Sequence, residues 1–211
     1  MRKSLLLGWT LACFAAFAAF AAFPTVALAA PPGTPPTFGG NATFCNGPYA
    51  LCIKAYCPTP NGMPTAGGTI DCVCDIINGW SMGPDSCDNR KTNLVSTYSN
   101  LYNPGHKTIS CASTTLWAWC YGSPCKPDPK NPKKAICTCP VLESEAVILV
   151  PEKACSSPAC SKVWSAATPQ ESKFANDYFW KVGKEKGGDP NPPAGSCSAT
   201  PPAKTGAGGE R

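Results

Sequence analysis

Short apolar runs separated by clusters of turn-forming residues dominate the middle of the chain. Residues 51–57, 69–77, 116–121 and 135–142 each join β-branched and aromatic residues between such clusters. Residues 146–150 add another apolar run. Short strands bounded by turn residues give this pattern. The sequence therefore predicts a small, disulfide-rich, mainly β protein with one or two short helices.

One helix is predicted after the last of these strands. Thr168, Pro169 and Glu171 supply in order an N-cap residue, a proline at the first helical position and a capping-box glutamate. The apolar residues that recur at helical spacing are Phe174, Tyr178, Phe179 and Val182. Residues 93–102 are predicted to form a second, shorter helix that ends before Asn-Pro-Gly.

Residues 1–29 are predicted to be a secretory signal peptide. Arg2 and Lys3 form a positive region, an Ala- and Phe-rich apolar run follows, and an A-x-A cleavage site ends at Ala29. An uncleaved anchor is the alternative, because the run nearly reaches the roughly 20 residues that cross a bilayer. With cleavage the chain would keep residues 30–211, have no membrane segment and be secreted or periplasmic.

Export changes the meaning of the cysteines. Of 15 cysteines in the sequence, one lies in the signal peptide and an even number remains, which in an oxidising compartment predicts seven disulfides. The spacing does not predict which cysteine pairs with which. The predicted disulfide cysteines are Cys45, Cys52, Cys57, Cys72, Cys74, Cys87, Cys111, Cys120, Cys125, Cys137, Cys139, Cys155, Cys160 and Cys197.

A cysteine pattern occurs twice. Residues 52–74 and residues 120–139 both read C-x4-C, a turn-rich loop, then C-x-C, with loops of 14 and 11 residues. Matched motifs of this kind indicate tandem repeats. In a strand the two cysteines of C-x-C share a face, so we expect each C-x-C strand to be joined twice to a facing C-x4-C segment.

The repeats predict a domain organisation. Residues 41–110 would form the first Cys-rich repeat and residues 111–186 the second, which includes the C-terminal helix. Residues 30–40 and 187–211 are rich in proline and glycine and are predicted to be flexible. Cys197 should tether the second of these segments.

The match between the repeats outside the motifs has two solutions. In one, Cys45 is the equivalent of Cys111 and Cys87 the equivalent of Cys155, and Cys160 and Cys197 are left as an extra pair. In the other, which neighbouring residues slightly favour, Cys87 is the equivalent of Cys160 and Cys111 the equivalent of Cys197, and Cys45 and Cys155 have no equivalent. The sequence does not decide between them.

Catalytic chemistry has little support in the sequence. The only histidine, His106, lies in a predicted turn. Asp71 and Asp75 flank the first C-x-C, but Ile136 and Pro140 occupy the matching positions in the second copy. No catalytic residues and no cofactor are therefore predicted.

Charge and cysteine spacing limit the other function classes. Loss of Arg2 and Lys3 would lower the formal net charge from +5 to +3, and the lysines lie mostly in Pro- and Gly-rich loops, so no nucleic-acid partner is predicted. Reduced C-x-C and C-x4-C thiolates could hold Zn(II) or Cu(I). Oxidation of the cysteines argues against this, so no metal ligand is predicted and metal binding is the third hypothesis.

Three tryptophans are the candidate binding residues. Trp117 and Trp119 alternate along a predicted strand, and Trp80 lies in a turn-like setting. Exposed, they could stack on sugar rings or contact a protein; the alternative is that they are core residues. The leading hypothesis is an exported, disulfide-stabilised protein with a structural or surface-recognition role toward an unknown protein or glycan. The alternative is a small secreted enzyme that acts on cell-wall or extracellular polymer.

Intact mass and thiol titration of the native protein, under denaturing and non-reducing conditions, test the cysteine prediction. We expect a chain that starts near Ala30, has no free thiol and is lighter by about 2 Da for each bridge than its reduced form. Several free thiols, or a retained metal ion, would contradict the disulfide prediction and favour the third hypothesis.

Overall fold

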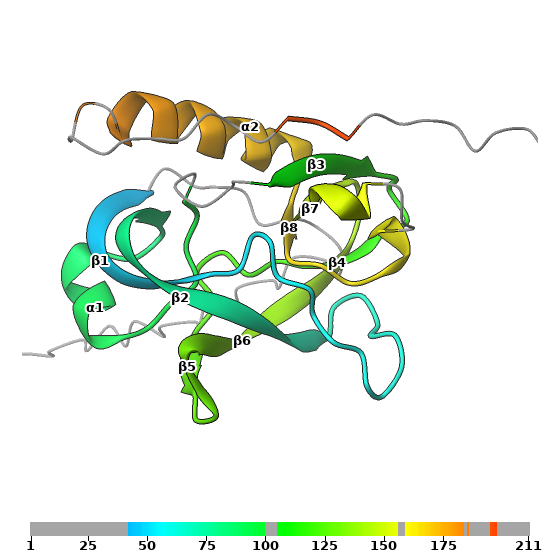
Figure 1. Cartoon of the computed structure of the whole chain (residues 1–211), viewed down its shortest axis with the longest axis horizontal. Helices are drawn as coiled ribbons and strands as arrows, with labels where there is room; N and C mark the ends of the chain where they lie inside the picture. The colour runs from blue at the N-terminus through cyan, green and yellow to red at the C-terminus, as the bar shows by residue number, and fades with distance from the viewer. Residues whose placement is uncertain (1–41, 100–104, 156–158, 184, 186–194, 198–211) are drawn as a thin grey trace, which may run out of the picture. The chain divides into compact units, whose positions relative to one another are not determined.

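The computed structural model describes residues 42–99, 105–155, 159–183, 185 and 195–197 (Figure 1). The predicted signal peptide, the predicted flexible segment 30–40 and most of the predicted tail 187–211 lie outside these residues. Within the part of the chain that the structure describes, no helix is long and apolar enough to cross a membrane.

The main sheet is antiparallel and carries the C-x-C strands at its centre. Its order is β1 (Thr43–Leu51), β2 (Thr69–Gly83), β6 (Asn131–Glu143) and β4 (Leu116–Ala118), and β5 (Cys125–Asp128) also pairs with β6. Cys72 and Cys74 of β2 are buried, whereas Asp71 and Val73 are exposed. One face of the β2–β6 pair therefore forms the core and the other faces outward.

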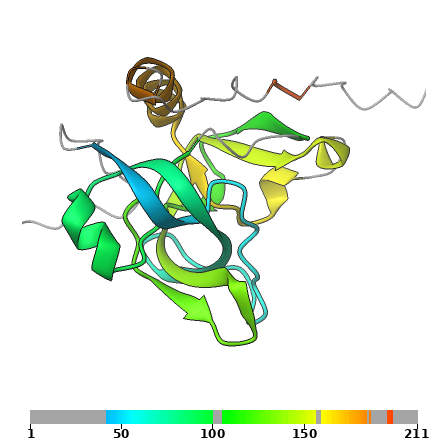
Figure 2. The ribbon, with the colours of Figure 1, turned by 60° about the vertical axis from the view of Figure 1, so that its left-hand side comes forward.

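A smaller sheet and the helices complete the fold. The second sheet has the order β3 (His106–Cys111), β7 (Ala146–Pro151) and β8 (Ala166–Ala167). The helices are α1 (Cys87–Thr92), which lies beside β1, and α2 (Pro169–Tyr178), which packs near β7 and β8 and continues into a π-helical turn at Phe179–Gly183 (Figures 1 and 2). Single 3-10 turns occur at Glu152–Ala154 and Ala159–Ser161. The prediction of a mainly β, disulfide-rich protein with short helices is confirmed.

Two predicted elements were wrong. The strand predicted at 51–57 ends at Leu51, because residues 52–57 fold into a turn in which Ala55 N–H donates to Cys52 C=O. The strand lies earlier instead, at Thr43–Leu51, and runs through Asn46-Gly47-Pro48, residue types that are common in turns. Residues 93–99 are not helical; they make isolated bridges to neighbouring segments, and the helix lies before them at α1.

All fourteen predicted cysteines are paired, in seven disulfides. The two motifs are cross-linked in the same nested way. Cys52–Cys74 and Cys57–Cys72 in the first correspond to Cys120–Cys139 and Cys125–Cys137 in the second. Each C-x-C strand is thus joined twice to its own C-x4-C segment, as expected.

These four disulfides form one buried cluster. The Sγ atoms of Cys52, Cys74 and Cys137 all lie within 4.8 Å of one another. The Sγ atoms of Cys72, Cys120 and Cys139 form a second such group. The first group takes two cysteines from the first motif and one from the second, and the second group takes one from the first motif and two from the second. Since the cysteines are already bonded in pairs, the groups are packed disulfides, and they form the centre of the hydrophobic core together with small apolar side chains.

The backbone contacts of the two motifs are also reciprocal. Cys72 lies opposite Cys137 where β2 pairs with β6. Cys57 N–H donates to Val163 C=O, and the corresponding Cys125 N–H donates to Leu94 C=O, so each predicted repeat bonds to a segment of the other. This is the arrangement that a two-fold axis through the Cys72 and Cys137 pair would produce. Duplication of an ancestral unit stays a prediction, and the two motifs build one common sheet.

The other three disulfides match neither predicted register as a whole. Their pairs are Cys45–Cys87, Cys111–Cys160 and Cys155–Cys197. The bridges Cys45–Cys87 and Cys111–Cys160 would correspond if Cys45 matches Cys111, as in the first register, and Cys87 matches Cys160, as in the second; the repeat itself stays a prediction. The extra bridge then ties Cys197 to Cys155, so Cys197 is tethered as predicted.

The predicted capping box of α2 is confirmed and includes a buried acid. Thr168 Oγ1 accepts from Glu171 N–H at 3.2 Å, and Glu171 Oε2 accepts from Thr168 N–H at 2.9 Å. Glu171 Oε1 accepts from Trp119 Nε1–H at 3.2 Å. Burial raises the pKa of the Glu171 carboxyl, and these hydrogen bonds only partly oppose the shift.

Glu171→Gln tests the consequence for stability. A carboxyl with a raised pKa in the folded state binds its proton more tightly when folded, so its contribution is largest below the usual glutamate pKa and is lost as pH rises above it. We expect the difference in the free energy of unfolding between wild type and Glu171→Gln to change as pH rises from the usual glutamate pKa through the raised pKa of Glu171. The change should favour the variant at the higher pH. A difference that is flat between pH 4 and pH 7, measured by urea denaturation, would contradict the raised pKa.

Candidate functional site

The three predicted tryptophans do not share an exposed face. Trp117 is fully buried, and its Nε1–H donates to Ser144 Oγ at 3.0 Å. Trp119 is half-buried against Glu171. Trp80 lies within β2, not in a turn, and stacks on Phe44 with ring centroids 4.9 Å apart. Trp117 is therefore a core residue here, and a binding role for Trp80 or Trp119 stays a prediction.

Among the described residues, the most exposed aromatic side chains are not the tryptophans predicted to bind a partner. Trp180 is 51% exposed, Tyr56 42% and Phe174 41%. Trp180 and Phe174 follow the capping box of α2, and the ring of Phe174 stacks on Tyr178. Tyr56 lies far from the other two in the sequence, and none of the three lines the hollow beside residues 58–64 or the pocket beside α1.

The candidate catalytic groups have structural partners. His106 begins strand β3 opposite Pro151, so the predicted turn at His106 was wrong. Asp71 accepts from Thr138 Oγ1–H at 2.7 Å. Asp75 is paired with Lys134 and Lys54; burial opposes its ionisation, but the two lysines outweigh burial and lower its pKa. Both carboxylates therefore interact with neighbouring side chains of the fold.

A hollow of the described surface lies along β2. It has a volume of about 490 Å³, within the roughly 300–1,000 Å³ typical of ligand pockets. One wall is the proline-rich loop 58–64, and the other is the outward side of β2 at residues 69–73 with Ile136 from β6. Val73 and Ile136 on the floor and Met63 on the rim are all more than a third exposed. We call this hollow the β2 groove.

The backbone of β2 is open on the side of this groove. Val141 of β6 donates to Gly68 C=O, and residues of an antiparallel strand alternate in the neighbour that they bond. In this part of β2, the backbone N–H and C=O groups of the even-numbered residues therefore point toward β6. Those of Thr69 and Asp71 point away from β6, toward the groove. No backbone hydrogen bond joins residues 58–64 to residues 69–73, both of which the structure describes in full.

In the second motif, the corresponding edge of the C-x-C strand β6 is paired with strand β5. There, β5 follows Cys125 directly and pairs with β6, with Lys126 opposite Ile136. Cys57 stands opposite Cys72 as Cys125 stands opposite Cys137, with Cα–Cα distances of 4.3 and 4.1 Å. The chain therefore enters both edges at the same point, and the next residue decides whether a strand forms.

In the first motif that next residue is proline. Pro58 corresponds to Lys126 and would have to donate a hydrogen bond opposite Asp71, but proline has no N–H. Pro60 removes the next donor on the same side. The loop therefore leaves the sheet at Cys57, and the edge that β5 fills in the second motif stays open.

Comparison with known proteins does not place the chain in a family. No family model, curated protein or solved structure matches it. The β2 groove and its open strand edge are the features of the described structure that bear most directly on function.

Hydrogen exchange tests whether the edge is open. We expect the amide of Asp71 to exchange with solvent much faster than the amide of Ile136, its counterpart in the second motif, because only Ile136 faces a paired strand. The amides of Cys72 and Cys137, which bond each other's strand, should both be protected and provide the internal control. Equal protection of Asp71 and Ile136, measured by NMR, would show that the β2 edge is closed.

Proposed function

We propose that this protein is an exported recognition protein that binds an extended peptide segment of another protein, which adds as a strand to β2. The observation that carries the proposal is the open edge at Thr69 and Asp71, at the place where the second motif holds its own strand β5. Strand addition to an exposed sheet edge is a common mode of peptide recognition, in which backbone hydrogen bonds supply affinity.

The groove indicates the chemistry of the peptide. Asp71 offers a backbone donor and acceptor pair, and the exposed side chains of Val73 and Ile136 offer an apolar floor. A bound strand would place alternate side chains on that floor. We therefore infer a partner segment with β-branched or other aliphatic residues at alternate positions and without proline at the position opposite Asp71.

The rigidity of the site supports recognition. Asp71 and Val73 alternate with Cys72 and Cys74, both of which are fully buried in disulfides. The binding edge is thus held on its rear face by two covalent bonds. A preorganised edge loses little conformational entropy on binding, which favours affinity.

The predicted compartment fits this function. Seven disulfides are typical of proteins in oxidising compartments, and residues 1–29 are predicted to be a signal peptide. We infer that the protein is secreted or periplasmic and that its partner is another exported or surface-displayed protein.

Selection from a phage-displayed library of random peptides provides the probe. We expect binders with alternating aliphatic residues, and we expect their addition to protect the Asp71 amide from exchange. Methylation of the peptide nitrogen that bonds Asp71 should weaken binding about tenfold, because a backbone hydrogen bond contributes on the order of 1 kcal/mol and the methyl group also obstructs the edge.

Two variants separate the groove from the rest of the sheet. Val73→Lys places a charge on the apolar floor and should weaken the selected peptides at least tenfold in calorimetric titrations. Asn78→Lys makes the same change in charge at an exposed residue of β2 outside the groove and should leave the affinity unchanged. Equal effects of both variants, or binders that perturb only amides remote from β2, would contradict strand addition.

A further inference from the structure

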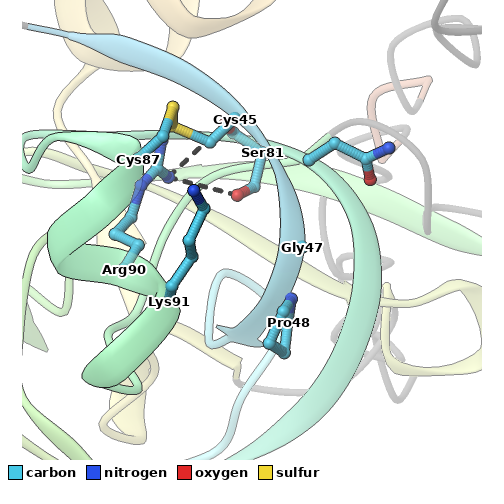
Figure 3. Close-up of a pocket in the computed structure, with 8 residues that line it drawn as sticks. Cys45, Gly47, Pro48, Ser81, Cys87, Arg90 and Lys91 are labelled. Atoms are coloured by element: carbon cyan, nitrogen blue, oxygen red, sulfur yellow. Dashed lines mark hydrogen bonds between the residues drawn. A yellow bond between two sulfur atoms is a disulfide. The ribbon is translucent and has the colours of Figure 1, made fainter.

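A second, much smaller pocket lies between α1 and the β1–β2 pair (Figure 3). Its free volume is about 20 Å³, which admits a single species of about the size of a water molecule. Figure 3 shows the side chains of Arg90 and Lys91 extending from α1 toward Ser81 of β2. The residues around the pocket are Cys45, Asn46, Gly47, Pro48, Ser81, Cys87, Arg90 and Lys91.

Arg90 is the buried polar residue of this pocket, with only 6% of its surface exposed. Its Nη2–H donates to Thr43 C=O at 2.7 Å, and its Nη1–H donates to Ser81 Oγ at 3.2 Å. Its Nε–H is buried and has no hydrogen-bond partner in the described part of the chain. The guanidinium also lies so close to Gly83 that a Cβ there would come within 2.8 Å of Nη1. The group is held in place, and its Nε–H is one of the donors that remain unused.

The charge of Arg90 is not balanced by an ion pair. Among the described residues, no carboxylate lies within 4.0 Å of its guanidinium. The neighbouring Lys91 is paired with Asp88 at 2.8 Å. Burial lowers the pKa of Arg90, and Tyr121 and Asp85 raise it only in part. An arginine remains charged at neutral pH, and a buried charge without a close counter-ion is unfavourable.

We propose that this pocket binds one small monovalent anion of halide size, such as chloride, with the guanidinium of Arg90 as its main source of positive charge. The hydroxyl of Ser81 accepts from Arg90, so its own hydrogen remains available to donate to the anion. The volume excludes larger oxyanions such as sulfate. The Cys45–Cys87 disulfide links the strand and helix that form the walls, so the anion would fasten α1 to β1. This site is independent of the β2 groove.

The anion dependence of stability provides the first test. Chloride that binds only the folded state lowers the unfolding equilibrium constant by the factor 1 + [Cl⁻]/Kd, a twofold reduction when chloride equals Kd. We expect this dependence in wild type when chloride replaces gluconate at constant ionic strength. It should be absent in Arg90→Gln and preserved in Lys173→Gln, the control at an exposed, ion-paired lysine of α2 outside the pocket. The same dependence in all three proteins, or none in wild type, would overturn the proposal.

Direct observation of the halide does not require a variant that folds. Crystals of the wild-type protein grown with bromide in place of chloride should show an anomalous peak in the pocket, beside the Arg90 guanidinium and Ser81 Oγ. ³⁵Cl line broadening by the protein should be reversed by bromide and not by sulfate. An ordered water without anomalous signal in the pocket, together with no specific chloride broadening, would show that water fills it and would refute the anion site.

Discussion

The double disulfide clamp behind β2 and β6 is the constraint on which the rest of the structure depends. Each C-x-C strand is bonded twice to its own C-x4-C segment, and the two strands pair with Cys72 opposite Cys137. A shift of β2 by one residue would turn its cysteines to the solvent face. The sulfur cluster therefore fixes the register of the sheet, which in turn fixes the residues on its outer face. Each native bridge contributes about 2–5 kcal/mol in small secreted domains, so the clamp also supplies stability that a core of small side chains would not.

The candidate site arises from a difference between two similar motifs. Both C-x4-C segments reach the sheet at a cysteine opposite the C-x-C strand, at Cys57 and at Cys125. Lys126 then continues as β5 and closes the edge of β6, whereas Pro58 leaves the edge of β2 open. The loss of a backbone N–H thus accompanies an open edge in place of a paired one, and the open edge is where we propose that the peptide binds. The covalent clamp allows this opening, because β2 remains held by β6 and by two disulfides.

The sequence predicted the parts of the fold that depend on local or chemical signals. The capping box at Thr168 and Glu171, the C-x-C strands and the full pairing of fourteen cysteines follow from local residue patterns and the redox compartment. The strand through Asn46-Gly47-Pro48 could not be predicted in this way, because its long pairing with β2 overrides the turn preference of those residues. The helix predicted at 93–102 was wrong for the same reason over its described part, residues 93–99, where Ser96 bridges to β1 and Tyr98 to β2.

The candidate sites were harder to predict because they depend on contacts between distant residues. The alternation of Trp117 and Trp119 left open whether they are surface or core residues, because it could not show which side of the short strand β4 faces the core. The signal for the β2 groove was present in the prolines at 58 and 60 against Lys126, yet it acquires meaning only when Cys57 and Cys125 are known to enter equivalent edges. Arg90 gave no signal, since its burial results from the packing of α1 against β1 and β2.

The most direct test of the central claim is to give the first motif the donor that the second motif has. Pro58→Lys restores an N–H opposite Asp71, and Pro64→Lys makes the same chemical change elsewhere in the loop as a control. If the missing donor keeps the edge open, hydrogen exchange should show the Asp71 amide protected in Pro58→Lys alone, and the selected peptides should no longer bind this variant. An Asp71 amide that exchanges equally fast in both variants, with peptide affinity unchanged, would contradict the account.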